Sequence, residues 1–147
     1  MTARETLMPV LLEKVYQLIQ DKLELAQQPL VTQLGQHLFS NISQDDLVER
    51  NESDLYGAVL SLWHHINEKK ADERSVRVFN PTVSRQGWQS THTIVEIVLP
   101  DSPFLVDSIK MALSRLGLAS HLMLTDLLIL HVTTMARSKA LIKEKGN

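Results

Sequence analysis

The fold is decided by a stretch that reads Val76-Arg77-Val78-Phe79-Asn80-Pro81 and then, from His92 onward, HTIVEIVLPDSPFLVDSIKMALSRLGLASHLML. The first run predicts a short strand of β-branched and aromatic residues, which Asn80-Pro81 ends. The second run begins with residues 92–99, which are apolar on both faces apart from Glu96, as is typical of a central strand covered on both sides. Because a polar turn or loop at 82–91 separates the two strands, we expect a hairpin.

The second run then changes from strand to helix at Pro100-Asp101-Ser102-Pro103. Ser102 is a good helix cap, Pro103 suits the first helical position, and Gly117 is a typical C-terminal stop. The apolar face between them consists of Leu105, Ile109, Ala112, Leu113 and Leu116. Residues 118–132, rich in Leu and Ile, predict either one long strand or two strands joined at Thr125-Asp126.

The chain before this stretch is predicted to be helical. An apolar stripe from Leu12 to Ala26 marks a long first helix, and Pro29 suits the first turn of a second. Ser43 and Asn51 are each followed three positions later by an acid, which predicts two further helix starts. The charged run 67–74 is the predicted boundary between a helical subdomain, residues 1–74, and a strand-containing module, residues 75–133. The polar, basic tail, residues 134–147, is expected to be a solvated helix or disordered.

The composition narrows the class of protein. A chain of 147 residues is long enough for one domain or for two small subdomains that share a core. A formal net charge of −2 provides no field that would attract nucleic acid or anionic lipid. The absence of cysteine excludes disulfides, thiolate zinc sites and cysteine nucleophiles. Because the sequence contains neither a signal-peptide pattern nor a long apolar segment, we expect a cytoplasmic protein that binds no nucleic acid and no membrane.

No motif for catalysis or cofactor binding is found. The five glycines are scattered, so neither a Walker A loop nor a GxGxxG turn is present. The six histidines form no HExxH or HxxxH pair, and adjacent His64 and His65 would point roughly 100° apart on a helix. The carboxylate pairs Asp45/Asp46 and Asp101/Asp107 are interpreted as charges at helix N-termini. We therefore predict no catalytic, cofactor-binding or metal-binding residue in this chain.

The two quoted runs, with Gly87-Trp88 between them, resemble the N-terminal region of the large bacterial NAD-specific glutamate dehydrogenases. The resemblance implies an ACT-like domain, a ferredoxin-like βαββαβ sandwich, of which these residues support the first half. The expected fold class is therefore α+β, a helical N-terminal subdomain followed by a complete or incomplete ACT-like strand-helix-strand sandwich. The chain after Val132 departs from the family pattern. A truncated chain, a shortened gene product and a divergent ending are the alternatives for that departure.

The resemblance also indicates a candidate ligand-binding or subunit-contact turn at residues 101–106. The usual ACT turn has an acidic or amide residue, then often Pro-Gly, then two aliphatic residues. The corresponding residues here are Asp101, Ser102, Pro103, Phe104, Leu105 and Val106. Phe104 stands where glycine is common, and glycine lets backbone N–H groups approach a small ligand, so amino-acid binding is disfavoured at this turn. Trp88, in a polar loop, is interpreted as a cover for the sheet or as a contact for a partner.

Two functions are expected from these observations. The first is a non-catalytic regulatory and assembly region of an NAD-dependent glutamate dehydrogenase, in which a face or edge of the sheet makes subunit contacts. It implies self-association or contact with the rest of a larger polypeptide, and an amino acid as a candidate effector. The family's reaction, oxidative deamination of L-glutamate to 2-oxoglutarate with NAD, belongs to a catalytic region that this chain lacks. The alternative is a stand-alone protein-protein interaction module on an ACT-like scaffold.

Overall fold

The computed structural model describes residues 3–40, 42–47, 50–69, 73–100, 103–118, 128–132 and 140–144. These residues form helices and strands that follow one another along the chain. In order they are α1 Ala3–Lys22, α2 Gln28–Phe39, α3 Gln44–Leu47, α4 Glu52–Glu68, β1 Ser75–Phe79, α5 Val83–Gln86, β2 Ile94–Val98, α6 Leu105–Arg115, β3 Leu128–Val132 and β4 Ala140–Glu144. This mixture confirms the predicted α+β class.

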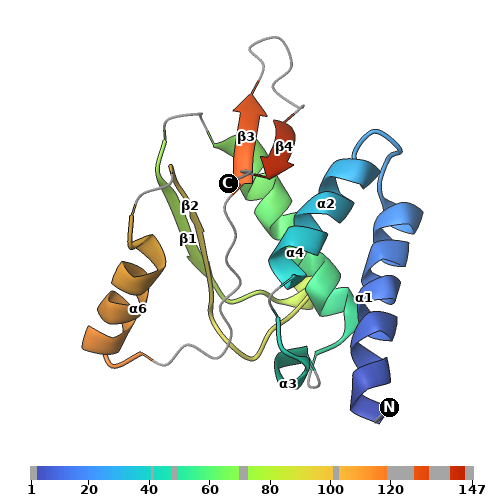
Figure 1. Ribbon diagram of the computed structural model, residues 1–147, viewed down its shortest axis with the longest axis horizontal. Coiled ribbons are helices and arrows are strands. Elements are labelled where there is room, and N and C mark those ends of the chain that lie inside the picture. The colour runs from blue at the N-terminus through green and yellow to red at the C-terminus, as the bar shows by residue number, and fades with distance from the viewer. Residues whose placement is uncertain are drawn as a thin grey trace.

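The helices α1, α2 and α4 lie side by side (Figure 1). They contribute most of the hydrophobic core, and Val15 and Ile19 of α1 belong to the apolar stripe predicted for that helix. The buried core residues are Leu11, Val15, Ile19, Val31, Leu34, Leu38, Phe39, Ile42, Leu47, Leu55, Tyr56, Val59, Trp63 and Ile66. Because burial of one large aliphatic side chain stabilises a fold by roughly 1.5–3 kcal/mol, this helical layer is the stable centre of the described chain.

The predicted helix starts are confirmed by the position of Pro29 and by the capping hydrogen bonds of Ser43 and Asn51. Pro29 lies in the first turn of α2. The backbone N–H of Asp46 donates to the Ser43 hydroxyl at 3.3 Å, and that of Asp54 donates to Asn51 Oδ1 at 2.8 Å. The first helix, in contrast, ends at Lys22, before the end of the predicted stripe at Ala26. The chain turns there, because the N–H of Gln27 bonds to the C=O of Glu24 at 2.9 Å.

The predicted hairpin is also confirmed. Strands β1 and β2 pair antiparallel in a register that places Arg77 opposite Glu96 and Val78 opposite Val95. Successive side chains of a strand point to opposite faces. One face of the hairpin is turned to α4, and α6 lies on the far side of the hairpin from α4 (Figure 1).

The expectation that residues 92–99 form a central, doubly covered strand is wrong within the described part of the chain. The sheet that contains β2 has two strands there, so β2 has a single described neighbour. Val95 is 48% exposed, whereas Glu96 is 7% exposed. The polar residue thus points inward and an aliphatic one points outward, because Glu96 has polar partners on α4.

The helix after the 101–106 turn begins later than predicted. Pro103 precedes α6 instead of opening it, and Phe104 occupies the N-cap position with φ 59° and ψ 21°, a left-handed conformation that no helix can continue. The C-terminal stop at Gly117 is confirmed by its φ of 70°. The N–H of Leu118 bonds to the C=O of Leu113 at 2.9 Å, as in a Schellman motif.

The C-terminal region contains a second antiparallel pair. Strand β3 pairs with β4, with Leu130 opposite Ile142. The expectation of a solvated helix or disorder in the tail is therefore wrong for residues 140–144, where pairing with β3 outweighs the basic composition. The predicted turn at Thr125-Asp126 lies outside the described residues, and the subdomain boundary at residue 74 stays a prediction.

Candidate functional site

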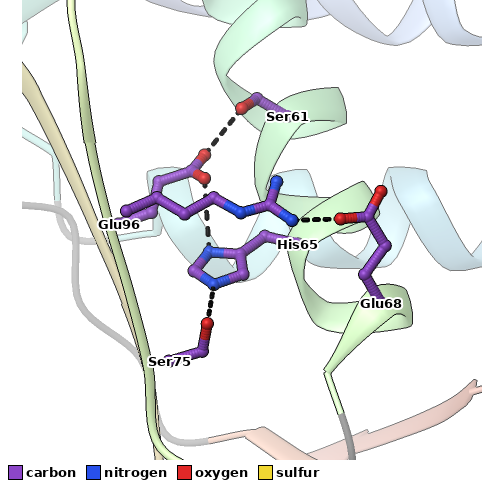
Figure 2. A network of polar contacts seen from close by, with 6 residues as sticks. Ser61, His65, Glu68, Ser75 and Glu96 are labelled. Carbon is purple, nitrogen blue, oxygen red and sulfur yellow. Dashed lines mark hydrogen bonds and ion pairs between the residues drawn. The ribbon is translucent and has the colours of Figure 1, made fainter.

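Polar side chains meet at the contact between α4 and the hairpin, and Figure 2 shows their arrangement. We call this group the His65 network. Its members are Ser61, His65 and Glu68 on α4, Ser75 and Arg77 on β1, and Glu96 on β2. His65 is 1% exposed and Glu96 is 7% exposed, so two titratable groups are buried together. Buried titratable groups are uncommon unless they are paired, which makes this the first place to look for function.

The sequence places these side chains together for simple geometric reasons. Ser61, His65 and Glu68 follow one another at steps of four and three residues, so they share one face of α4. Ser75 and Arg77 are two positions apart and therefore share one face of β1. The antiparallel register then brings Glu96 opposite Arg77.

The imidazole of His65 lies between a hydroxyl and a carboxylate. Its Nε2 is 2.7 Å from Ser75 Oγ, and its Nδ1 is 3.3 Å from Glu96 Oε1. The separation of Nδ1 and Glu96 Oε1 is within ion-pair range, but these two atoms are not aligned as a hydrogen bond. Neither atom has another hydrogen-bond partner in the described chain. Glu96 Oε2 accepts a bond from the Ser61 hydroxyl at 2.8 Å. We assign the ring proton to Nδ1, facing the carboxylate, so that Nε2 accepts from Ser75.

Arg77 and Glu68 form an ion pair at the edge of the network. Their side chains are 38% and 65% exposed. Exposed ion pairs contribute on the order of 0–1 kcal/mol, so this pair adds little to stability by itself. Its larger effect is the positive charge that Arg77 brings near the buried imidazole.

Burial lowers the pKa of His65 below its ordinary value, and the charge of Arg77 lowers it further. The carboxylates of Glu96 and Glu68 act in the opposite direction but do not outweigh burial. The imidazole is therefore neutral at neutral pH.

A carboxylate, an imidazole and a serine hydroxyl in line also occur in acyl-transfer enzymes. In such enzymes the imidazole accepts a proton during the reaction and must be stable as a cation. Here the ring is 1% exposed, and burial opposes that cation. The arrangement joins α4 to the hairpin through polar contacts.

The predicted 101–106 turn is described only in part. Asp101 and Ser102 lie outside the described residues. Pro103 and Phe104 are exposed, and Leu105 and Val106 are half-buried. The Phe104 side chain is 78% exposed while its backbone is left-handed, a conformation that glycine adopts without strain. A ligand or subunit contact at this turn stays a prediction.

Trp88 has a clear structural role. Its side chain is 6% exposed and packs directly on Gly57 of α4, in the space that a Cβ at residue 57 would occupy. Its ring also meets Phe79 of β1 edge to face, with centroids 6.1 Å apart. Trp88 covers the inner side of the hairpin, as one of its two interpretations predicted. A partner contact stays a prediction that this burial does not favour.

The far side of the hairpin is apolar and exposed. We call Val76, Val78, Val95 and Ile97 the outer face. Val76, Val78 and Val95 are 61%, 64% and 48% exposed, and Ile97 is half-buried. The register places Val76 opposite Ile97 and Val78 opposite Val95, so the four side chains are neighbours. A cluster of exposed aliphatic side chains commonly marks an interaction site.

Sequence reasoning missed the His65 network. One signal was present, since Glu96 is the single charged residue in an otherwise apolar strand. A second was His65, which lies between the core positions Trp63 and Ile66 on α4. A buried glutamate and a buried histidine each need a polar partner. Only the tertiary contact between α4 and the hairpin shows that Glu96 and His65 are partners.

Comparisons with known proteins agree with the fold. The family model of the glutamate dehydrogenase ACT1 domain matches residues 34–143. The chain is 47% identical over 100 residues to an NAD-specific glutamate dehydrogenase of Pseudomonas aeruginosa, which covers 68% of this chain and 6% of that protein. It is 37% identical over 111 residues to the NAD-specific glutamate dehydrogenase of Halomonas elongata, covering 76% and 7%. The chain thus corresponds to less than a tenth of these curated relatives.

No solved structure gives a significant match. Among the described helices, none has the length and apolar content needed to cross a membrane.

Proposed function

Because the chain belongs to the family of the glutamate dehydrogenase ACT1 domain, we propose that it is a non-catalytic regulatory and assembly region of an NAD-dependent glutamate dehydrogenase. The fold is ACT-like, and both relatives are named NAD-specific glutamate dehydrogenases. The proposed parent reaction is oxidative deamination of L-glutamate to 2-oxoglutarate with NAD. It would be carried out by residues outside this chain, in the cytoplasm.

The observation that carries the assembly proposal is the outer face. Its three most exposed valines lie on adjacent strands and present apolar area to water. Burial of apolar area against another protein surface is favourable by about 25 cal/mol per Å². We assign the subunit contact to this face and expect the chain to associate with itself through it.

Light scattering over a range of protein concentrations tests this assignment. The mass of the wild-type chain is expected to rise above 16.7 kDa with concentration. Val78→Glu should remain at the monomer mass, because a charge on the outer face opposes its burial. Helix α1 lies away from the hairpin (Figure 1). Val10→Glu on α1, at a position that is 43% exposed, is therefore the matched control and should behave like wild type. A wild-type chain that stays monomeric at every concentration would contradict self-association.

An amino-acid effector is the regulatory part of the proposal. A ligand that binds only the folded chain raises its melting temperature once the ligand concentration exceeds its Kd, and the rise continues with the logarithm of the concentration. Thermal shift measurements with each of the common amino acids therefore test it. If no amino acid changes the melting temperature at millimolar concentration, the regulatory part is contradicted while the assembly part stands.

The alternative is a stand-alone protein-protein interaction module on an ACT-like scaffold, and the exposed outer face is the observation that favours it. This module would be a monomer that uses the outer face for a different protein. The light-scattering series separates the two functions, since only the assembly region changes its mass with its own concentration.

A further inference from the structure

We propose that the His65 network is a pH-sensitive latch, which holds the β1–β2 hairpin on α4 at neutral pH and releases it on acidification. The latch joins the β1–β2 hairpin to the helical layer, and these two parts differ in how much of the hydrophobic core they contain. The hydrophobic core belongs to the helices, and Val98 is the hairpin residue that packs against it within the described chain. The other contacts between the hairpin and α4 in the described chain include the packing of Trp88 on Gly57, the His65 network, and a hydrogen bond from the backbone N–H of Gln89 to Asp54 Oδ1 at 3.3 Å. A change at His65 therefore acts on the contact between hairpin and helices before it acts on the core.

Within the described residues, three elements place polar groups around His65. On α4 these are Ser61 and Glu68, on β1 they are Ser75 and Arg77, and on β2 it is Glu96. Two carboxylates and one guanidinium thus face or neighbour the ring. The neutral ring satisfies Ser75 through Nε2 and presents its Nδ1 proton toward Glu96.

Protonation changes this arrangement at both nitrogens. Nε2 becomes a donor, so the Ser75 hydroxyl loses its acceptor and must find another for its own proton. The ring also becomes a buried cation with the positive charge of Arg77 nearby. Glu96, at 3.3 Å, is too poorly aligned to compensate for the hydration that the cation would have in solvent. Separation of the hairpin from α4 would return the charged ring to solvent.

The direction of the His65 pKa agrees with this mechanism. A histidine whose pKa is lower in the folded state binds more protons when it is released. Its contribution to holding the hairpin is complete above the ordinary histidine pKa of about 6.5. That contribution is lost as the pH falls from there toward the lowered value.

Hydrogen exchange followed by mass spectrometry tests the latch on the whole 147-residue chain. Protection factors, corrected for the intrinsic pH dependence of exchange, are compared at pH 7.5 and pH 5.5. Peptides from residues 75–79 and 94–98 should lose protection at the lower pH, by up to about tenfold per pH unit, because one proton is linked to release. Peptides from α1 and α2 should keep theirs.

His65→Gln keeps the hydrogen-bonding character of the side chain but cannot titrate, so its hairpin should show equal protection at both pH values. His64→Gln on the same helix, where the side chain is exposed, is the matched control and should behave as wild type. Equal acid sensitivity in wild type and His65→Gln, or parallel loss of protection in helices and hairpin, would overturn the latch.

A second measurement decides the question if His65→Gln does not fold. NMR titration of the wild-type histidine rings reports each pKa directly. The latch requires the His65 pKa to lie below the ordinary histidine value of about 6.5. A His65 pKa at or above that ordinary value would overturn the proposal, whatever the variants do.

Discussion

Gly57 allows a close approach of the hairpin loop to α4. The ring of Trp88 lies against its Cα, so any Cβ at this position would overlap the indole. Gly57→Ala is expected to lower the free energy of unfolding by about 1–3 kcal/mol, the usual effect of overpacking, despite the better helix propensity of alanine. Urea denaturation measures this loss.

Gly35→Ala on α2 is the control for that substitution. Its Cβ would meet Tyr16 at 3.4 Å, an ordinary contact, so the helix propensity of alanine should dominate. We expect no loss of stability and a gain of up to about 1 kcal/mol. Equal effects of the two substitutions would show that Trp88 does not fill the space at Gly57.

Phe104 combines an exposed ring with a left-handed backbone. For a residue with a Cβ this conformation costs roughly 1–2 kcal/mol, whereas glycine adopts it freely but loses about 0.5–1 kcal/mol of unfolded-state entropy. Phe104→Gly should therefore raise the free energy of unfolding by up to about 1 kcal/mol. Phe104→Ala removes the same ring, keeps the Cβ and should give no gain. If both variants lose stability, the ring makes contacts that matter.

Among the elements, α4 is the one that joins the core to the hairpin, and its start depends on Asn51. Asn51→Ala removes the acceptor for the Asp54 N–H and should cost about 1 kcal/mol in urea denaturation. Thr82→Ala is the matched control, because Thr82 stands at the N-cap of α5 without a side-chain capping bond. A similar loss in both variants would contradict a specific role for the Asn51 cap.

Local sequence signals predicted most of the elements. The caps at Ser43 and Asn51, Pro29 and the stop at Gly117 depend on interactions within a few residues, so they could be read from the sequence. The hairpin was predicted from two strand-like runs separated by a polar loop. Strand β4 was missed because the basic composition of the tail indicated a solvated segment, although it pairs with the preceding strand β3. The outward orientation of Val95 was missed because it follows from the partners of Glu96 on α4, a contact between distant parts of the chain.

In the whole molecule, the two faces of the β1–β2 hairpin differ in their surroundings. The inner face is fixed to the helical layer by Trp88 and the His65 network, and the outer face presents aliphatic side chains. The family resemblance, the α+β class and the helical core could be predicted from the sequence. The polar contact that joins hairpin and helices required three elements to be placed in space.

The most direct test of the outer face as a subunit contact uses the absence of cysteine from the chain. In Val78→Cys the introduced thiol is the single site for maleimide labelling, at a position where the valine is 64% exposed. We predict that its labelling rate falls as protein concentration rises, because association covers the outer face, while the rate for Val10→Cys on α1 stays constant. A Val78→Cys labelling rate that is independent of concentration, with a mass that rises on light scattering, would place the contact elsewhere and contradict the account.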